Sequence, residues 1–180
     1  MFLNEPIRPV KLFIAILRNF SYPKELILYP LELNWGEIDY ESKDYPFDKT
    51  DYYQKEMGEN LTRFFVSFKK IIPPHEISQI KKMTNAIESC YSANQNRGFN
   101  LDPGYIDFHK VVLASYKFGG QKIAIDQEIY ADLTLYYHKG TYTSFPWTFP
   151  DFHDNRYYHD LLEIRRIYKN QIKNLDILEQ

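Results

Sequence analysis

The chain has 180 residues, 17% of them aromatic, and a formal net charge of −2 at pH 7. This length is enough to bury a core without disulfides or metals, and the weak negative charge excludes the chain-wide basic surface of many nucleic-acid-binding proteins. The single cysteine, Cys90, excludes an intramolecular disulfide and is typical of a reducing compartment, so we expect a cytoplasmic protein. The longest apolar run, residues 12–17, is too short to span a membrane, so we expect no membrane partner.

The first part of the chain predicts a strand, a helix and a second strand. Residues 10–17 are apolar on both faces apart from Lys11, a pattern typical of a buried strand in the centre of a sheet. Pro23 is placed to open a helix, and Pro30 predicts a kink or break within it, because proline removes a helical hydrogen bond. Residues 38–42 then alternate with charged neighbours, which predicts the second strand.

The middle of the chain predicts a long strand followed by an amphipathic helix. Residues 61–72 alternate, with apolar side chains such as Phe64 on one face and polar side chains such as Arg63 on the other. Residues 77–91 carry apolar side chains at helical spacing. Because Cys90 falls within that apolar stripe, we expect its thiol to be buried and inert.

A proline–glycine pair marks the most distinctive polar segment. Pro103 fixes its own φ and Gly104 tolerates positive φ, so the segment from Asp102 to Tyr105 is expected to form a type I or II turn. An apolar strand over residues 111–117, ending in a lysine, follows it. Such a turn would hold a carboxylate and a phenol in fixed geometry at the edge of a sheet.

The remaining elements complete an α+β pattern. Residues 121–126 and 128–138 predict an antiparallel pair, and residues 155–172 predict a C-terminal helix. The order β-α-β-β-α-β, followed by a hairpin and a helix, is that of a ferredoxin-like core with a C-terminal extension. We therefore expect one α+β domain spanning residues 1–180.

Several strings, in order along most of the chain, resemble a prokaryotic family of unknown function, DUF4416. They include Pro9 to Phe13, Phe47 to Tyr53 with Glu56 to Gly58, Asn100 to Tyr105, Val111 to Ser115 with Lys117, Ile129 to Ala131, Lys139 with Gly140, and Pro146 to Asp151. Members of this family are often labelled GTP-binding proteins. This sequence, however, lacks the G-x-x-x-x-G-K-[ST] phosphate loop, so the resemblance implies no defined activity.

Carboxylates stand beside tyrosines in several expected loops. Asp48 and Asp51 lie in residues 44–60, and Asp102 lies in the predicted turn. If these loops converge, the three acids would supply oxygen ligands for Mg²⁺ or Mn²⁺. The alternative is that each acid simply caps a helix or a turn.

Together these features predict a polar cleft that binds a small anionic or nucleotide-like ligand, with or without a metal. The strand over residues 128–138 has one polar face, which would form the floor of this cleft or simply face solvent. The expected cleft residues are Asp48, Asp51, Tyr52, Asp102, Tyr105, Lys117, Tyr130, Asp132, Lys139 and Trp147. The alternative function is a non-catalytic RNA- or protein-binding module that uses a tyrosine-rich sheet face.

Overall fold

The computed structural model describes residues 7–93 and 96–178. The elements in chain order are β1 (Val10–Asn19), α1 (Glu25–Trp35), β2 (Ile38–Glu41), β3 (Tyr45–Pro46), α2 (Gln54–Met57), β4 (Leu61–Ile72), η1 (Pro74–Glu76), α3 (Ile77–Cys90), β5 (Ser92–Ala93), β6 (Asn96–Arg97), β7 (Phe99–Ile106), β8 (Lys110–Ser115), β9 (Ile123–Ala124), β10 (Tyr130–His138), β11 (Thr141–Ser144), α4 (Pro150–His153), η2 (Asn155–Tyr157) and α5 (Tyr158–Leu178).

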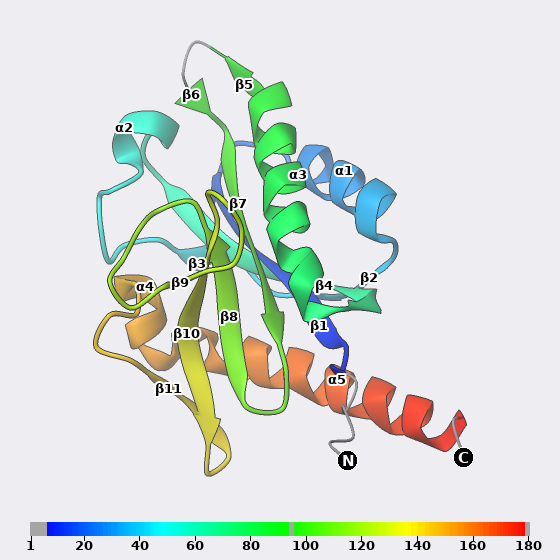
Figure 1. The fold of residues 1–180 in the computed structure, drawn as a ribbon. Coiled ribbons are helices and arrows are strands. Elements are labelled where there is room, and N and C mark those ends of the chain that lie inside the picture. The colour runs from blue at the N-terminus through cyan, green and yellow to red at the C-terminus, as the bar shows by residue number, and fades with distance from the viewer. Residues whose placement is uncertain (1–6, 94–95, 179–180) are drawn as a thin grey trace.

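One large antiparallel sheet organises the molecule, with strand order β11-β10-β8-β7-β1-β4-β2 (Figure 1). β3 pairs with β4 and β9 pairs with β10 at the margins of this sheet, and β5 and β6 form a separate small ladder. Helices and strands are therefore mixed around one principal sheet, which is an α+β architecture. The expected pairing of residues 121–126 with 128–138 is present as the short β9–β10 ladder.

β1 is the central, fully covered strand that the sequence predicts. On one face, Leu12 and its alternate neighbours pack in a cluster with Ile27 of α1 and Ile80 of α3. On the other face, Phe13 packs in a second cluster with Leu161 of α5. Because both faces of β1 contact helices, its side chains are buried over residues 10–17, and the prediction is confirmed.

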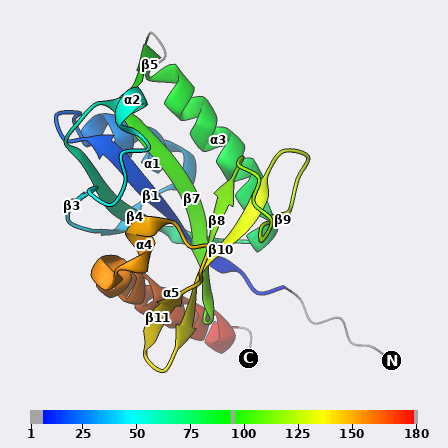
Figure 2. The same cartoon turned by 90° about the vertical axis from the view of Figure 1, so that its left-hand side faces the viewer.

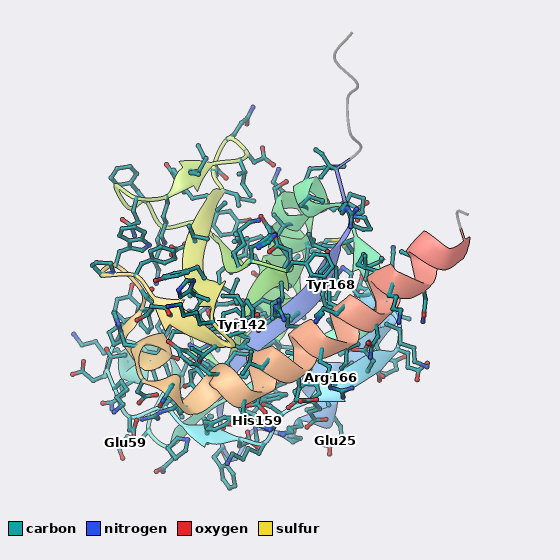
Figure 3. The ribbon with its side chains drawn as sticks, turned by 90° about the horizontal axis from the view of Figure 1, so that it is seen from below. Glu25, Glu59, Tyr142, His159, Arg166 and Tyr168 are labelled. Atoms are coloured by element: carbon teal, nitrogen blue, oxygen red, sulfur yellow. The ribbon has the colours of Figure 1, made fainter. Side chains whose placement is uncertain are left out.

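The long helix α5 covers the second face of the sheet, and Figure 3 shows it crossing beneath the strands. Tyr168 lies between α5 and the sheet, where its hydroxyl donates to the Pro9 carbonyl at 2.9 Å. Arg166 is exposed on the helix and pairs with Glu163 at 2.8 Å. α5 begins at Tyr158 and ends at Leu178, later at both ends than the predicted 155–172.

Two local predictions are corrected. α1 continues through Pro30 without the predicted break, because the carbonyl that loses its partner belongs to Leu26, an exposed residue in the first turn of the helix. Cys90 is exposed. The buried side of α3 runs from Ile77 to Glu88, and Cys90, two residues after Glu88, lies on another side of the helix. That buried side also contains two charged residues, Lys81 and Glu88.

Lys11 is the one charged residue within the apolar run of β1, and the fold satisfies it completely. Its ammonium group donates to Asp39, to the Phe68 carbonyl and to Gln171 Oε1. Burial lowers the pKa of Lys11, while the hydrogen bond and negative charge of Asp39 act in the opposite direction. All three ammonium donors have acceptors, so this buried cation fastens β1 to β2, β4 and α5.

Candidate functional site

The segment from Asp102 to Tyr105 is part of strand β7 rather than a turn, so that prediction is wrong. Pro103 lies opposite Ile14 of β1. The ladder between β7 and β8 consists of three pairs, from Ile106–Val111 to Gly104–Leu113. The ladder therefore stops at Gly104 and does not include Pro103, and Figure 2 shows the two strands separating beyond this point. Proline fits at this position because the neighbouring strand no longer requires an N–H donor.

The free edge of β7 beyond Pro103 is satisfied by side chains of α3. Leu101 donates its N–H to Glu88 Oε1 at 2.8 Å, and its carbonyl accepts from Lys81 Nζ at 3.0 Å. Alternate residues of a strand direct their backbone groups to the same side, so Pro103 faces this edge without an N–H to satisfy. The two charged residues on the buried side of α3 thus replace a neighbouring strand and allow β8 to diverge.

Gly104 is required by close packing at the point of divergence. A Cβ atom at this position would lie 2.4 Å from the Val112 carbonyl oxygen and 2.9 Å from a ring carbon of Phe13. The glycine that predicts a turn in the sequence is therefore needed here because β7 lies close to both β8 and β1.

A cleft of about 280 Å³ opens where β7 and β8 separate. Its basic side chains are Arg63, Lys81, Arg97, Lys117 and Lys122, and its acidic side chains are Glu88, Asp102 and Asp132. Aromatic rings complete the wall, namely those of Tyr53, Tyr116, Phe149 and Phe152. The lining thus combines an excess of positive charge with flat apolar surfaces.

Arg63 of β4 is the most deeply buried cation of the cleft, with 2% of its side chain exposed. Its Nε donates to Asp151 Oδ2 at 2.6 Å, while Nη1 lies 3.7 Å from Asp102, beyond hydrogen-bonding distance. Nη1 of Arg63 and Oδ1 of Asp151 are both buried without a hydrogen-bond partner. The guanidinium therefore retains unused donor capacity beside the cleft.

The two carboxylates beside Arg63 respond differently to burial. For Asp102, burial alone would raise the pKa, but the positive charges of Lys81 and Arg63 and a hydrogen bond from Asn100 outweigh it, so the pKa lies below its usual range. For Asp151, which is fully buried, desolvation prevails over the attraction of Arg63 and raises the pKa. Asp102 is thus held charged at the cleft, whereas Asp151 supports Arg63 from behind.

Lys117 is the exposed cation of the cleft. Its ammonium group lies 4.2 Å from the ring centroid of Tyr52 and 5.3 Å from that of Tyr53. Among the described residues no carboxylate pairs with it, whereas Lys122 pairs with Asp132 at 3.1 Å. Lys117 therefore offers a positive charge that other protein groups do not neutralise.

The structure brings together part of the expected site. Asp102, Lys117 and Asp132 all line the cleft, and Tyr52 contacts Lys117. Tyr105 faces a different hollow, which it shares with Phe108. The signal that located the shared residues was the polar character of the loops and strand ends, which is where β7 and β8 part.

The other expected residues lie outside the cleft. Asp48 pairs with Arg156 at 2.8 Å, and Asp51 is an exposed residue whose carbonyl accepts from Gln54. Three further placements complete the set: Tyr130 packs on Phe118, Lys139 is exposed in the β10–β11 turn, and the indole of Trp147 donates to the Leu133 carbonyl.

The expected metal site of Asp48, Asp51 and Asp102 is not assembled. Asp48 faces Arg156, and Asp102 is surrounded by Lys81, Arg63 and Asn100, so the charges that a metal would supply come from protein cations. In the part of the chain that the structure describes, no group of three or more His, Cys, Asp or Glu side chains could hold a metal ion. These residues do not fit Mg²⁺ or Mn²⁺.

Arg63, Lys81 and Glu88 are among the cleft residues that sequence reasoning missed. Arg63 stood on the polar face of a predicted strand, which the pattern alone would assign to solvent. Lys81 and Glu88 are seven residues apart, two helical turns, and this spacing on one side of a helix was the available signal.

Comparisons with known proteins place the chain in a family. None of the curated proteins and no solved structure matches it. Across residues 7–93 and 96–178, no helix has the length and apolar character needed to cross a membrane. A family model described as "Domain of unknown function (DUF4416)" matches residues 8–168, most of the chain, and the protein therefore belongs to the DUF4416 family.

Proposed function

We propose that this protein binds a small anionic or nucleotide-like ligand in the cleft between β7 and β8. The observation that carries the proposal is unused donor capacity at two cations of the same cleft. Arg63 has a buried terminal nitrogen without an acceptor, and Lys117 has no carboxylate partner among the described residues. An oxyanion would accept from Lys117 and would be attracted by the positive charge of Arg63, and arginine and lysine are the usual protein partners of phosphate and carboxylate groups.

The walls and size of the cleft support a small organic anion. Tyr53, Tyr116 and Phe149 offer ring surfaces for a planar or apolar part of the ligand. The volume of about 280 Å³ is near the lower end of ligand pockets, which suits one small molecule rather than a dinucleotide. Lys81 and Glu88 keep β7 and β8 apart, so the cavity exists before a ligand enters.

Anion-dependent stabilisation tests this proposal. Orthophosphate and pyrophosphate should raise the thermal unfolding temperature of the wild type, since a ligand that binds the folded state stabilises it by mass action. Lys117→Gln should weaken this shift. Lys139→Gln, which removes an exposed lysine outside the cleft, is the matched control and should leave it unchanged. Equal shifts in the two variants, or none in the wild type, would contradict anion binding at this cleft.

A second candidate function rests on an exposed aromatic cluster around β10 and β11. The rings of Phe145 and Trp147 stack at 4.8 Å with an interplanar angle of 5°, and Tyr136 packs on Phe145 at 5.2 Å. Such a platform suits an RNA- or protein-binding module, because bases and apolar side chains stack on aromatic rings. Quenching of tryptophan fluorescence by single-stranded RNA that is lost in Trp147→Leu but retained in Trp35→Leu, which removes a buried core ring, would assign the stacking residue and separate this function from the cleft.

We also infer a ferredoxin-like core and a cytoplasmic location. The strands β1, β2, β4 and β7 stand in the sheet order β7-β1-β4-β2 with helices α1 and α3 on one face, which supports that core. The single cysteine supports a reducing compartment. Both inferences are independent of the ligand.

A further inference from the structure

An acidic side chain stands beside the anion-binding cations of the cleft. Asp102 lies 3.4 Å from Lys81 Nζ and 3.7 Å from Arg63 Nη1, and it accepts a hydrogen bond from Asn100 at 2.7 Å. About a quarter of its side chain (24%) remains exposed, and it lines the cleft. A ligand in this part of the cleft therefore meets the carboxylate of Asp102.

This carboxylate limits the chemistry of the ligand. An ionised carboxylate accepts hydrogen bonds and donates none, so a second oxyanion placed against it would be repelled. The part of the ligand next to Asp102 must instead carry an N–H or O–H donor. Lys81 and Arg63 already compensate the charge of Asp102, so an ammonium group would meet two cations there, whereas a neutral hydroxyl group would not.

We propose, resting on the anion-binding function above, that the cleft takes a phosphorylated polyol or monosaccharide. The phosphate group accepts from Lys117 and is attracted by the positive charge of Arg63, and a hydroxyl group donates to Asp102. The amide of Asn85, which also lines the cleft, is available to a further hydroxyl. The face of a sugar ring that carries C–H groups packs on the aromatic wall of the cleft, which includes Tyr53.

The cleft volume agrees with this class of ligand. A volume of about 280 Å³ accommodates one small ring or chain with one phosphate group and leaves little space for a second ring system. Hydroxyl recognition by a partly buried, charged acceptor is also selective, because a ligand that lacks the hydroxyl displaces water from the acceptor without replacing its hydrogen bond.

The experiment compares phosphates with and without hydroxyl groups by isothermal titration calorimetry. The probes are ribose 5-phosphate, glucose 6-phosphate and glycerol 3-phosphate, with butyl phosphate as the hydroxyl-free organophosphate. We expect at least one hydroxylated probe to bind the wild type about tenfold more tightly than butyl phosphate, the effect of one hydrogen bond to a charged group. In Asp102→Asn this preference should fall to about threefold or less, because the acceptor loses its charge. Asp48→Asn, in which the exposed acid lies outside the cleft, should retain it.

The possible outcomes separate the two proposals. Equal binding of butyl phosphate and all three hydroxylated probes to the wild type overturns the polyol inference and leaves anion binding intact. Absence of binding by every phosphate overturns both. A preference that persists in Asp102→Asn removes the assigned role of Asp102 and overturns the inference in this form. Because the comparison among probes is made first in the wild type, it does not depend on whether the variant folds.

Discussion

Two buried cations lie near opposite ends of β1, and they differ in how fully the protein satisfies them. Lys11 has no exposed surface, and its three donors reach Asp39, a backbone carbonyl and Gln171. Arg63, opposite Leu17 of β1, has five donors, of which one makes a hydrogen bond within the described part of the chain, to Asp151. Both cations are buried and both face a carboxylate, but only Arg63 lines a cleft.

On the proposed function, the difference separates a structural charge from a charge that attracts a ligand. A cation that is needed only for the fold is best placed where every donor has an acceptor, because each unpaired donor costs free energy of folding. Arg63 departs from this rule at the point where β7 and β8 separate. An incomplete set of hydrogen bonds is therefore more informative about function here than burial or charge.

The largest expected effect comes from Arg63→Met. This variant leaves Asp151, which has no exposed surface, without its cation, and breaking a buried pair from one side costs about 3–5 kcal/mol of unfolding free energy. Urea unfolding monitored by circular dichroism measures the loss. The double variant Arg63→Met/Asp151→Leu should recover most of it, since both charges are then absent; a double variant as unstable as the single one would contradict this account.

Lys11→Met should have the next largest effect, about 2–3 kcal/mol, because it removes hydrogen bonds to a charged donor. Its carboxylate partner Asp39 retains 11% exposure and can be partly rehydrated, which makes the loss smaller than for Arg63→Met. Urea unfolding again measures stability, and phosphate binding should be unchanged in this variant. Weakened phosphate binding would show that Lys11 is not purely structural.

Asp102→Asn should reduce stability by about 1–2 kcal/mol near pH 6, since it removes the negative partner of Lys81 and Arg63. The pKa of Asp102 is lower in the folded protein than in the unfolded chain, where it is about 3.9. The stabilisation is therefore complete above the unfolded value and is lost as the pH falls through the folded value. The difference between wild type and variant should shrink below about pH 4; a constant difference from pH 6 to pH 2.5 would contradict an ionised Asp102.

The smallest expected effect is that of Lys117→Gln on stability. This side chain is exposed and contacts the rings of Tyr52 and Tyr53, so the unfolding free energy should change by about 0.5 kcal/mol or less. Phosphate binding should nevertheless weaken in the same protein sample. A large loss of stability would indicate that Lys117 is structural and would remove the contrast with Lys11.

Local pattern was sufficient for much of the fold. The two apolar faces of residues 10–17 predicted a buried central strand, and the stripe over residues 77–91 predicted α3. Pattern failed where a residue type serves two purposes. Pro103 and Gly104 mark turns in most sequences, but here one ends a ladder and the other permits close packing.

The candidate site was predictable only in part, for a related reason. Asp102 and Lys117 could be predicted because they are polar residues at the ends of an apolar segment, and they do share the cleft. Arg63 could not be predicted in the same way. The polar face of its strand is covered by α4 and α5, which lie nearly a hundred residues further along the chain, and local pattern does not show this. The positions of Asp48 and Asp51 depend equally on distant partners, in the first case Arg156.

The hydrogen bonds between the backbone of Leu101 and the side chains of Lys81 and Glu88 also affect the register of the hairpin formed by β7 and β8. A ladder of three pairs is short enough to slip, and a slip of one residue would turn every side chain of β8 to the wrong face. Lys81 and Glu88 occupy the backbone groups that a slipped β8 would need, and Pro103 offers it no N–H. The residues that open the cleft thereby disfavour alternative pairings, so the docking of α3 on β7 helps to fix the register of β8.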